Sequence, residues 1–203
     1  MPHPQAVLFD FGGVLVRTES QASRRQWEAR LGLAPGALSG VVFDSETARR
    51  ATLGELPVEA VWAAVAERFS LDAEATAALR QDFFAGDRLD ETLVALVKSL
   101  RPHYRTAILS NAWGGARQAF SDIYGLHNAV DDMIISAEVG LAKPDARIYH
   151  LAARRLGVPP EAAVLVDDFV ENVEGARAAG LQAIRFTPDL DLRAALVEAG
   201  VEV

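Results

Sequence analysis

Short apolar runs alternate with amphipathic stretches along most of the chain. The apolar runs cover residues 6–9, 106–109, 133–135, 163–166 and 182–186, and a polar residue follows each of them. Such runs are typical of strands buried on both faces of a parallel sheet. Helical periodicity covers residues 91–100, 116–123, 146–156 and 173–179, and a glycine closes the last two segments. This alternation predicts an α/β fold with a doubly wound parallel sheet.

Residues 17 to about 88 break the alternation. Helical patterns follow one another over residues 21–31, 45–53, 58–69 and 73–84 without an intervening strand pattern. Proline and glycine at residues 34–36, 56–57 and 86–87 mark the turns and the exit of this segment. We therefore predict a helical insertion at 17–88 in an α/β core formed by residues 1–16 and 89–203.

Composition narrows the function classes. The chain has 203 residues, a formal net charge of −8 and a pI near 5.0, which argues against a nucleic-acid surface and a basic membrane-docking face. It contains no cysteine, which excludes a disulfide framework, a zinc-thiolate cluster and a thiol nucleophile. The N-terminus lacks the features of a signal peptide, and no run reaches about 18 apolar residues. We expect a cytoplasmic protein, and nothing in the sequence indicates its oligomeric state.

Polar residues follow three of the predicted strands. Asp10 follows the first, before Gly12 and Gly13, whereas Ser110 and Asp168 follow two later strands. Ligands of such sheets bind beyond the carboxyl ends of the strands, so these side chains are expected to converge on one edge. A kinase motif is excluded at Asp10, because the elements that such a motif requires upstream have no room in nine residues. Taken alone, Asp10 is equally compatible with a turn or capping role.

Two further positions suggest recognition of an anion. The Ser110-Asn111 pair offers a hydroxyl and backbone N–H groups to an anionic oxygen, although an ordinary helix cap has the same pattern. Lys143 is one of only two lysines against eighteen arginines, and it precedes Pro144, which restricts the backbone. A surface lysine is the ordinary interpretation, whereas a cation pointing in one fixed direction is the functional one.

The Asp167-Asp168 pair ends a strongly apolar strand. Adjacent carboxylates repel each other unless a cation or a proton intervenes, so a metal ion is one explanation and a solvated helix N-terminus is the other. Oxygen ligands without cysteine or clustered histidine favour Mg²⁺ over zinc, because Mg²⁺ accepts one or two carboxylates together with substrate phosphate.

Taken together, Asp10, Ser110, Lys143 and Asp168, in this order and with these neighbours, resemble the haloacid dehalogenase-like (HAD) hydrolase superfamily. The segments 135–145 and 166–180 carry most of the resemblance, and residues 9–15 with 109–111 look most like a subgroup that includes alpha-D-glucose-1-phosphate phosphatase. The resemblance implies a Rossmann-like core with strand order 5-4-1-2-3 and a helical cap after the first strand. Residues 17–88 match the place of that cap.

The resemblance also implies a Mg²⁺-dependent phosphatase for a small phosphorylated metabolite, with sugar phosphates among the candidates. Asp10 would be the nucleophile and would form an aspartyl-phosphate that water hydrolyses. The implied metal ligands are Asp10, the Gly12 carbonyl and Asp168. Asp167 and Asn172 would not bind the metal themselves but would hold these ligands in place.

The same resemblance assigns phosphoryl binding to Ser110 and the Asn111 amide, with Lys143 balancing the charge of nucleophile and substrate. The physics agrees with this assignment. Each like-charge contact near 4 Å costs about 4 kcal/mol at an effective dielectric constant of about 20, so a phosphate dianion needs cations beside these carboxylates. One divalent ion and one lysine supply them.

Gly12 departs from the family pattern, which usually places there the aspartate that protonates the leaving group. Such a group contributes about 10²- to 10⁴-fold in rate. A cap carboxylate such as Glu19, Asp44 or Glu46 is one replacement, a substrate with a good leaving group removes the need for one, and weak or absent catalysis is the third explanation.

Rival functions remain open at this stage. A 2-haloacid dehalogenase shares the fold but needs no metal and typically has tyrosine at the Gly12 position, so the Asp167-Asp168 pair argues against it. A related phosphomutase normally keeps the aspartate that Gly12 replaces. A non-catalytic or weakly catalytic protein that binds a phosphorylated ligand is the alternative from another class. Trp113 follows the Ser110-Asn111 pair. Its side chain is expected either to pack in the interior or to line a substrate pocket.

Overall fold

A computed structural model describes residues 3–203. Met1 and Pro2, with which the predicted core segment 1–16 begins, lie outside the described residues. Its main sheet contains five parallel strands: β1 (Ala6–Phe9), β4 (Arg105–Ser110), β5 (Asp132–Ile135), β6 (Ala163–Asp167) and β7 (Gln182–Arg185). The order across this sheet is β7-β6-β1-β4-β5. Counted in chain order within this sheet, these strands read 5-4-1-2-3, which confirms the predicted α/β fold and its Rossmann-like sheet.

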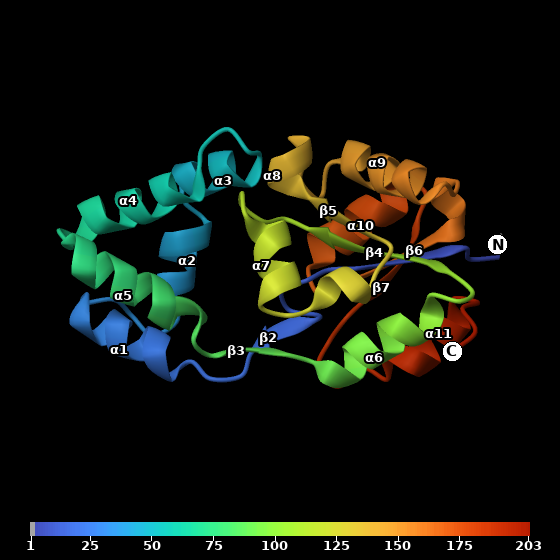
Figure 1. The fold of residues 1–203 in the computed structure, drawn as a ribbon, viewed down its shortest axis with the longest axis horizontal. Coiled ribbons are helices and arrows are strands. Elements are labelled where there is room, and N and C mark those ends of the chain that lie inside the picture. The colour runs from blue at the N-terminus through green and yellow to red at the C-terminus, as the bar shows by residue number, and fades with distance from the viewer. Residues whose placement is uncertain (1–2) are drawn as a thin grey trace.

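Helices cover both faces of the sheet (Figure 1). They are α6 (Glu91–Leu100), α7 (Ala116–Asp122), α8 (Ser136–Val139), α9 (Ala146–Leu156), α10 (Val170–Ala178) and α11 (Leu192–Glu198), with short 3-10 turns at Leu126–Asn128 and Pro160–Ala162. Alternate residues of a strand point to opposite faces. In β1, Val7 and Phe9 pack against α6, α7 and α11, whereas Leu8 packs against α9 and α10. Both faces of the central strand are therefore buried, as its continuous apolar run predicts.

The insertion contains the helices α1 (Ala22–Arg30), α2 (Ala37–Phe43), α3 (Glu46–Thr52), α4 (Val58–Phe69) and α5 (Ala73–Phe84). These helices enclose apolar clusters of their own, separate from the two clusters on the sheet, and lie beside the core in Figure 1. We call them the cap. The division at residues 16/17 and 88/89 stays a prediction.

The expectation of helices alone in this segment was wrong at both of its ends. Strand β2 (Val16–Thr18) pairs in antiparallel fashion with β3 (Asp87–Leu89), and this two-stranded ribbon joins the cap to the core. The ribbon escaped the periodicity argument because each strand has only three residues, most of them polar. The chain therefore leaves and re-enters the core through paired strands.

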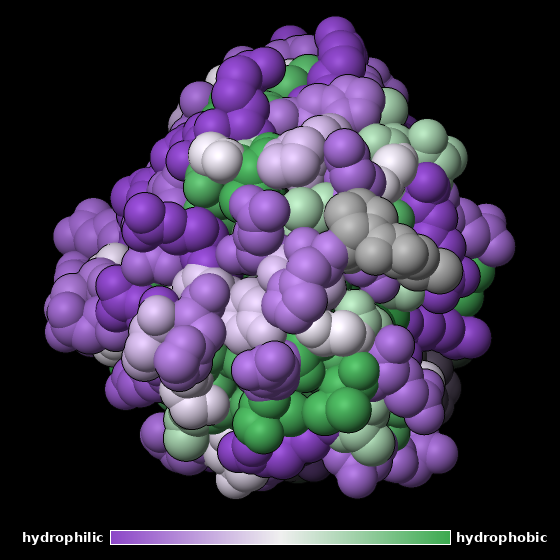
Figure 2. Space-filling view, turned by 90° about the vertical axis from the view of Figure 1, so that its right-hand side faces the viewer, coloured by the Kyte–Doolittle hydropathy of each residue, from purple (hydrophilic) through white to green (hydrophobic). Residues whose placement is uncertain are grey.

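The face at the amino ends of the main strands lies away from the cap. Figure 2 looks onto this side and shows a largely hydrophilic surface with a smaller apolar area. An open groove of about 800 Å³ there is lined by Pro4, Tyr104 and Val158, among others. Within residues 3–203 no helix combines the length and the apolarity that crossing a membrane requires.

Candidate active site

The carboxyl ends of β1, β4 and β6 bring the predicted polar residues to one edge of the sheet. Asp10, Ser110 and Asp167 are buried at the ends of these strands. Asp10, Asp167 and Asp168 each offer a carboxylate oxygen, and these oxygens lie within 4.8 Å of one another. The parallel register explains this convergence, because β1 pairs with β4 on one side and with β6 on the other.

Lys143 lies inside this cluster and not on the surface. Its side chain is 0% exposed, and Nζ lies 2.6 Å from Asp167 Oδ2 and 3.0 Å from Asp10 Oδ1. A buried cation requires such partners, because taking an unpaired charge out of water costs several kcal/mol or more. Of the two interpretations of Lys143, the structure favours a cation with one fixed direction.

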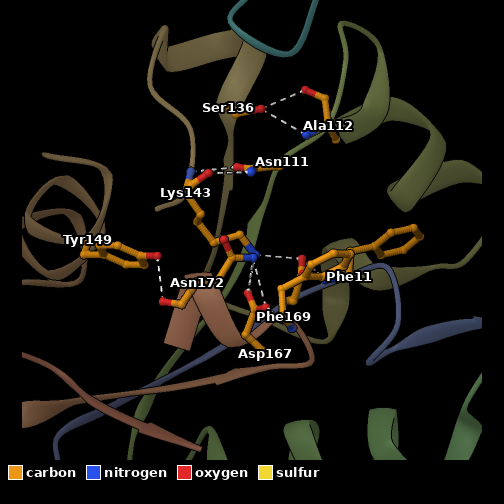
Figure 3. A network of polar contacts seen from close by, with 10 residues as sticks. Phe11, Asn111, Ala112, Ser136, Lys143, Tyr149, Asp167, Phe169 and Asn172 are labelled. Atoms are coloured by element: carbon orange, nitrogen blue, oxygen red, sulfur yellow. Dashed lines mark hydrogen bonds and ion pairs between the residues drawn. The ribbon is translucent and has the colours of Figure 1, made fainter. Parts of the chain in front are cut away.

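Asp167 is held by a network that Figure 3 shows. The N–H of Phe169 donates to Asp167 Oδ1 at 2.9 Å, and Asn172 Nδ2 lies 3.0 and 3.2 Å from the two carboxylate oxygens. The carbonyl of Asn172 in turn accepts a 2.8 Å hydrogen bond from the buried hydroxyl of Tyr149. Sequence reasoning placed Asn172 near the site but missed Tyr149, because a tyrosine on the apolar face of a helix looks like a core residue.

The loop after β4 is held by two further pairs of hydrogen bonds. The side chain of Asn111 pairs with the main chain of Lys143, and the Ser136 hydroxyl contacts both the N–H and the carbonyl of Ala112, at 3.0 and 3.1 Å (Figure 3). Sequence reasoning gave Ser136 no role, although it directly follows β5. The side-chain amide of Asn111 is thus engaged, so only its backbone N–H stays available for the predicted contact with a phosphoryl group.

The electrostatics of the cluster favour an added cation. Burial raises the pKa of Asp10 to about 7, against the opposing effect of Lys143, and Asp167 raises it further. Burial and then the charge of Asp167 raise the pKa of Asp168 as well. The raised pKa values mean that the protein stabilises the ionised form of both carboxyl groups incompletely. A bound metal ion would supply the missing positive charge.

The surroundings of Asp168 fit a small hard metal ion. Its Oδ1 is buried and accepts no hydrogen bond within the described residues. Gly13 approaches the same carboxylate with φ of +81°, and a Cβ on Gly13 would collide with it. A glycine at this position thus leaves room for the carboxylate, which offers an oxygen ligand without another partner. Carboxylate oxygens of this kind suit Mg²⁺.

Gly12 lies at the open side of the site. No atom of residues 3–203 lies within 4 Å of the position that a Cβ on Gly12 would occupy, its two chain neighbours aside. Of the cap carboxylates considered as replacements, Glu46 forms a surface pair with Arg49 at 3.3 Å, and Glu19 and Asp44 are exposed. None of the three belongs to the acidic cluster found in the described part of the chain.

Comparison with known proteins identifies the family. A sequence model described as haloacid dehalogenase-like hydrolase matches residues 4–180. The chain belongs to this family. Phosphatase MT3486 of Mycobacterium tuberculosis is 30% identical to this HAD-like hydrolase over 192 residues, which cover 88% of this chain and 85% of that protein.

Two further proteins are similar to this chain, one in sequence and one in fold. Phosphoserine phosphatase of Thermus thermophilus is 29% identical over 204 residues, which cover 91% of this chain and 82% of that protein. The structure of HAD family enzyme BT-2542 of Bacteroides thetaiotaomicron, in complex with magnesium and inorganic phosphate, aligns with a TM-score of 0.78 at 15% identity. That alignment covers 95% of this chain and 98% of the other, and it shows a shared fold.

In this HAD-like hydrolase the cap contacts the core beside the site. Trp113, three residues beyond Ser110, packs against both apolar clusters of the cap. Its ring centroid lies 5.4 Å from that of Phe43, at the end of α2, which is 46% exposed. Trp113 therefore joins the loop after β4 to the cap, so its packing role is established by these contacts.

Proposed function

We propose that this hydrolase is a Mg²⁺-dependent phosphatase that acts on a small phosphorylated metabolite through an aspartyl-phosphate on Asp10. The proposal depends on one observation above all, the meeting of Asp10, Asp168 and the buried ammonium of Lys143 at the carboxyl ends of the strands. The phosphatase names of the two sequence relatives support it. So does the acidic cluster, which could hold a metal ion.

The proposed reaction has two steps. A carboxylate oxygen of Asp10 attacks phosphorus, the bond from phosphorus to the ester oxygen breaks, and the alcohol portion leaves with the bonding electron pair. Water then attacks phosphorus, the bond from phosphorus to the Asp10 oxygen breaks, and the carboxylate is restored. The proton that water loses balances the alkoxide released in the first step, so the products are inorganic phosphate and the alcohol. Lys143 would offset the charge of nucleophile and phosphoryl group, and the Ser110 hydroxyl with the Asn111 backbone N–H would bind phosphoryl oxygens.

Asp10, Asp168 and the Gly12 carbonyl would hold the metal ion. When bound, Mg²⁺ would neutralise carboxylate charge and polarise a phosphoryl oxygen. Asp167, which already pairs with Lys143, and Asn172 would keep this set in place.

The absence of a side chain at Gly12 limits which phosphate esters can serve as good substrates. Without a side chain at this position, no group of the acidic cluster stands where the family acid would protonate the leaving oxygen. An ester whose leaving group is stable as an anion needs less protonation, and an anomeric sugar phosphate is of this kind. We therefore assign a sugar 1-phosphate as the preferred substrate class, in line with the resemblance of residues 9–15 and 109–111 to the subgroup that includes alpha-D-glucose-1-phosphate phosphatase.

The first test is a panel of phosphate esters assayed with Mg²⁺ and with EDTA. We expect turnover only with Mg²⁺, and we expect Asp10→Asn to lower kcat by about 10³-fold or more because it removes the nucleophile. Circular dichroism of the variant checks that it folds. Turnover that persists in EDTA contradicts the metal assignment, and full activity of the variant contradicts the nucleophile assignment.

A second test examines the missing acid. We expect log(kcat/KM) for aryl and alkyl phosphates to fall steeply as the leaving-group pKa rises, because no side chain supplies the proton. A Cβ at Gly12 meets no atom within 4 Å apart from its chain neighbours, and Gly12→Asp should flatten this dependence. A flat dependence in the unmodified protein would show that another residue acts as the acid.

A further inference from the structure

Asn111 and Lys143 are joined by a closed pair of hydrogen bonds. Asn111 Nδ2 donates to the carbonyl oxygen of Lys143 at 2.8 Å, and the N–H of Lys143 donates to Asn111 Oδ1 at 2.8 Å (Figure 3). The two bonds engage both peptide groups that flank the Cα of Lys143. They therefore fix where this Cα lies and in which direction its side chain leaves the backbone.

The position of the Lys143 ammonium depends on where this Cα lies. Its side chain has four rotatable bonds, is 0% exposed, and reaches oxygens of Asp167 and Asp10 at 2.6 and 3.0 Å. Hydrogen bonds tolerate displacements of only a few tenths of an ångström. A shift of about 1 Å at the reacting groups costs about 10²-fold in rate, so anchoring the backbone of the lysine has a chemical consequence.

We propose that Asn111 is a positioning residue for Lys143, whose ammonium it holds between Asp10 and Asp167 through the main chain. The chemistry of the pair explains the residue type. Aspartate has no N–H to donate to the carbonyl, and leucine matches the shape of asparagine but offers neither group. The placement of the lysine stands on geometry alone, and only its effect on turnover rests on the proposed function.

Selective labelling of lysine tests the placement without any assay of activity. The chain has only two lysines, and Lys98 is exposed on α6, so it serves as an internal reference. We expect reductive methylation, followed by peptide mass spectrometry, to modify Lys98 readily and Lys143 slowly. In Asn111→Leu the rate at Lys143 relative to Lys98 should rise about tenfold or more, because local opening no longer has to break the two hydrogen bonds to Asn111.

A matched control lies on β4, the strand that Asn111 directly follows. Thr106→Val removes the 3.3 Å hydrogen bond from the Thr106 hydroxyl to Asp131 at the other end of β4, and it should leave the labelling ratio unchanged. If Asn111→Leu does not fold, Asn111→Asp replaces it, because this variant keeps the acceptor for the Lys143 N–H and puts a charged acceptor in place of the donor that faces the Lys143 carbonyl. An unchanged ratio in a folded Asn111 variant overturns the proposal, as does an equal rise in Thr106→Val.

Turnover separates positioning from direct contact with the substrate. We expect Asn111→Leu to lower kcat by about 10²-fold with little change in KM. In a Lys143→Met background the same substitution should change kcat by less than about threefold, because the group that it positions is gone. Effects that multiply in the double variant would show that the Asn111 side chain acts independently of the lysine. Absence of Mg²⁺-dependent turnover in the unmodified protein would count against the proposed function alone, since the labelling result stands apart from it.

Discussion

Gly12 and Gly13 are adjacent, but only Gly13 faces a side chain. Its φ of +81° lies in the left-handed region, and an added Cβ would collide with the Asp168 carboxylate. A Cβ on Gly12 would meet open space, apart from its chain neighbours, among the described residues. A side chain is therefore sterically excluded at Gly13 but not at Gly12, and the sequence does not show this difference.

This difference gives a matched pair of variants. Gly13→Ala should lower Mg²⁺ affinity and kcat/KM by about 10-fold to 100-fold, the range seen when groups around metal ligands are displaced. Gly12→Ala should change both by less than about threefold, because at this position alanine supplies no acid and meets no neighbour. Isothermal titration with Mg²⁺ and steady-state kinetics measure the two quantities. Equal losses in both variants would show that the collision with Asp168 is not the cause.

At the same scale, strand-end residues were predictable and supporting residues were not. Asp10 and Asp168 follow apolar runs, and parallel strands bring such positions together whatever the details of packing. Lys143 was identified by its rarity and by Pro144. Tyr149 and Ser136 act through partners that only the tertiary structure brings near, so no local pattern marks them.

At the scale of elements, the sheet was predictable and the ribbon was not. A strand buried on both faces has a continuous apolar run, which separates it from its neighbours along the sequence. Helices α2 and α11 were also missed. The first contains Gly40, which weakens a helical pattern.

The ribbon also anchors the cap. Asp87 Oδ1 on β3 accepts a 2.6 Å hydrogen bond from the Thr18 hydroxyl on β2 and lies 3.2 Å from Nη2 of Arg24 on α1. Arg24 is buried, and its Nε donates to the carbonyl of Phe83 at the end of α5. Burial lowers the pKa of Arg24, and Asp87 opposes this effect. One carboxylate therefore ties both strands of the ribbon to the cap.

Two substitutions on this carboxylate separate charge from hydrogen bonding. Asp87→Asn should lower the free energy of unfolding by about 3 kcal/mol, because it removes the carboxylate that forms an ion pair with a buried guanidinium. Thr18→Val removes one neutral donor from the same oxygen and should cost about 1 kcal/mol. Urea denaturation gives both values. Equal losses would mean that the ion pair adds nothing beyond a hydrogen bond.

On the scale of the whole molecule, two carboxylates outside the active site, Asp90 and Asp131, contribute to the response to acid. Burial alone would raise the pKa of Asp90, but its hydrogen bonds from the N–H of Leu93 and from Arg17, at 2.9 and 2.5 Å, outweigh burial and lower it. Burial alone would also raise the pKa of Asp131, but the hydrogen bonds from the N–H of Thr106 and from Arg101 outweigh burial and lower it. Both groups therefore hold their protons less tightly in the folded chain than in the unfolded chain, where the pKa is about 3.9.

The sign of the pH dependence follows from this difference. A carboxyl group with a lowered pKa contributes its full stabilisation above about pH 4 and loses it as the pH falls through the folded pKa, because the unfolded chain takes up protons first. Asp90→Asn keeps the oxygen that caps α6 but loses the charge that faces Arg17. We expect this variant to be less stable than the unmodified protein at pH 7 by about 1 kcal/mol, and we expect the difference to shrink below pH 4. Urea denaturation at pH 7, 4 and 3 measures it. A difference that stays constant across this range would mean that the Asp90 charge does not stabilise the fold.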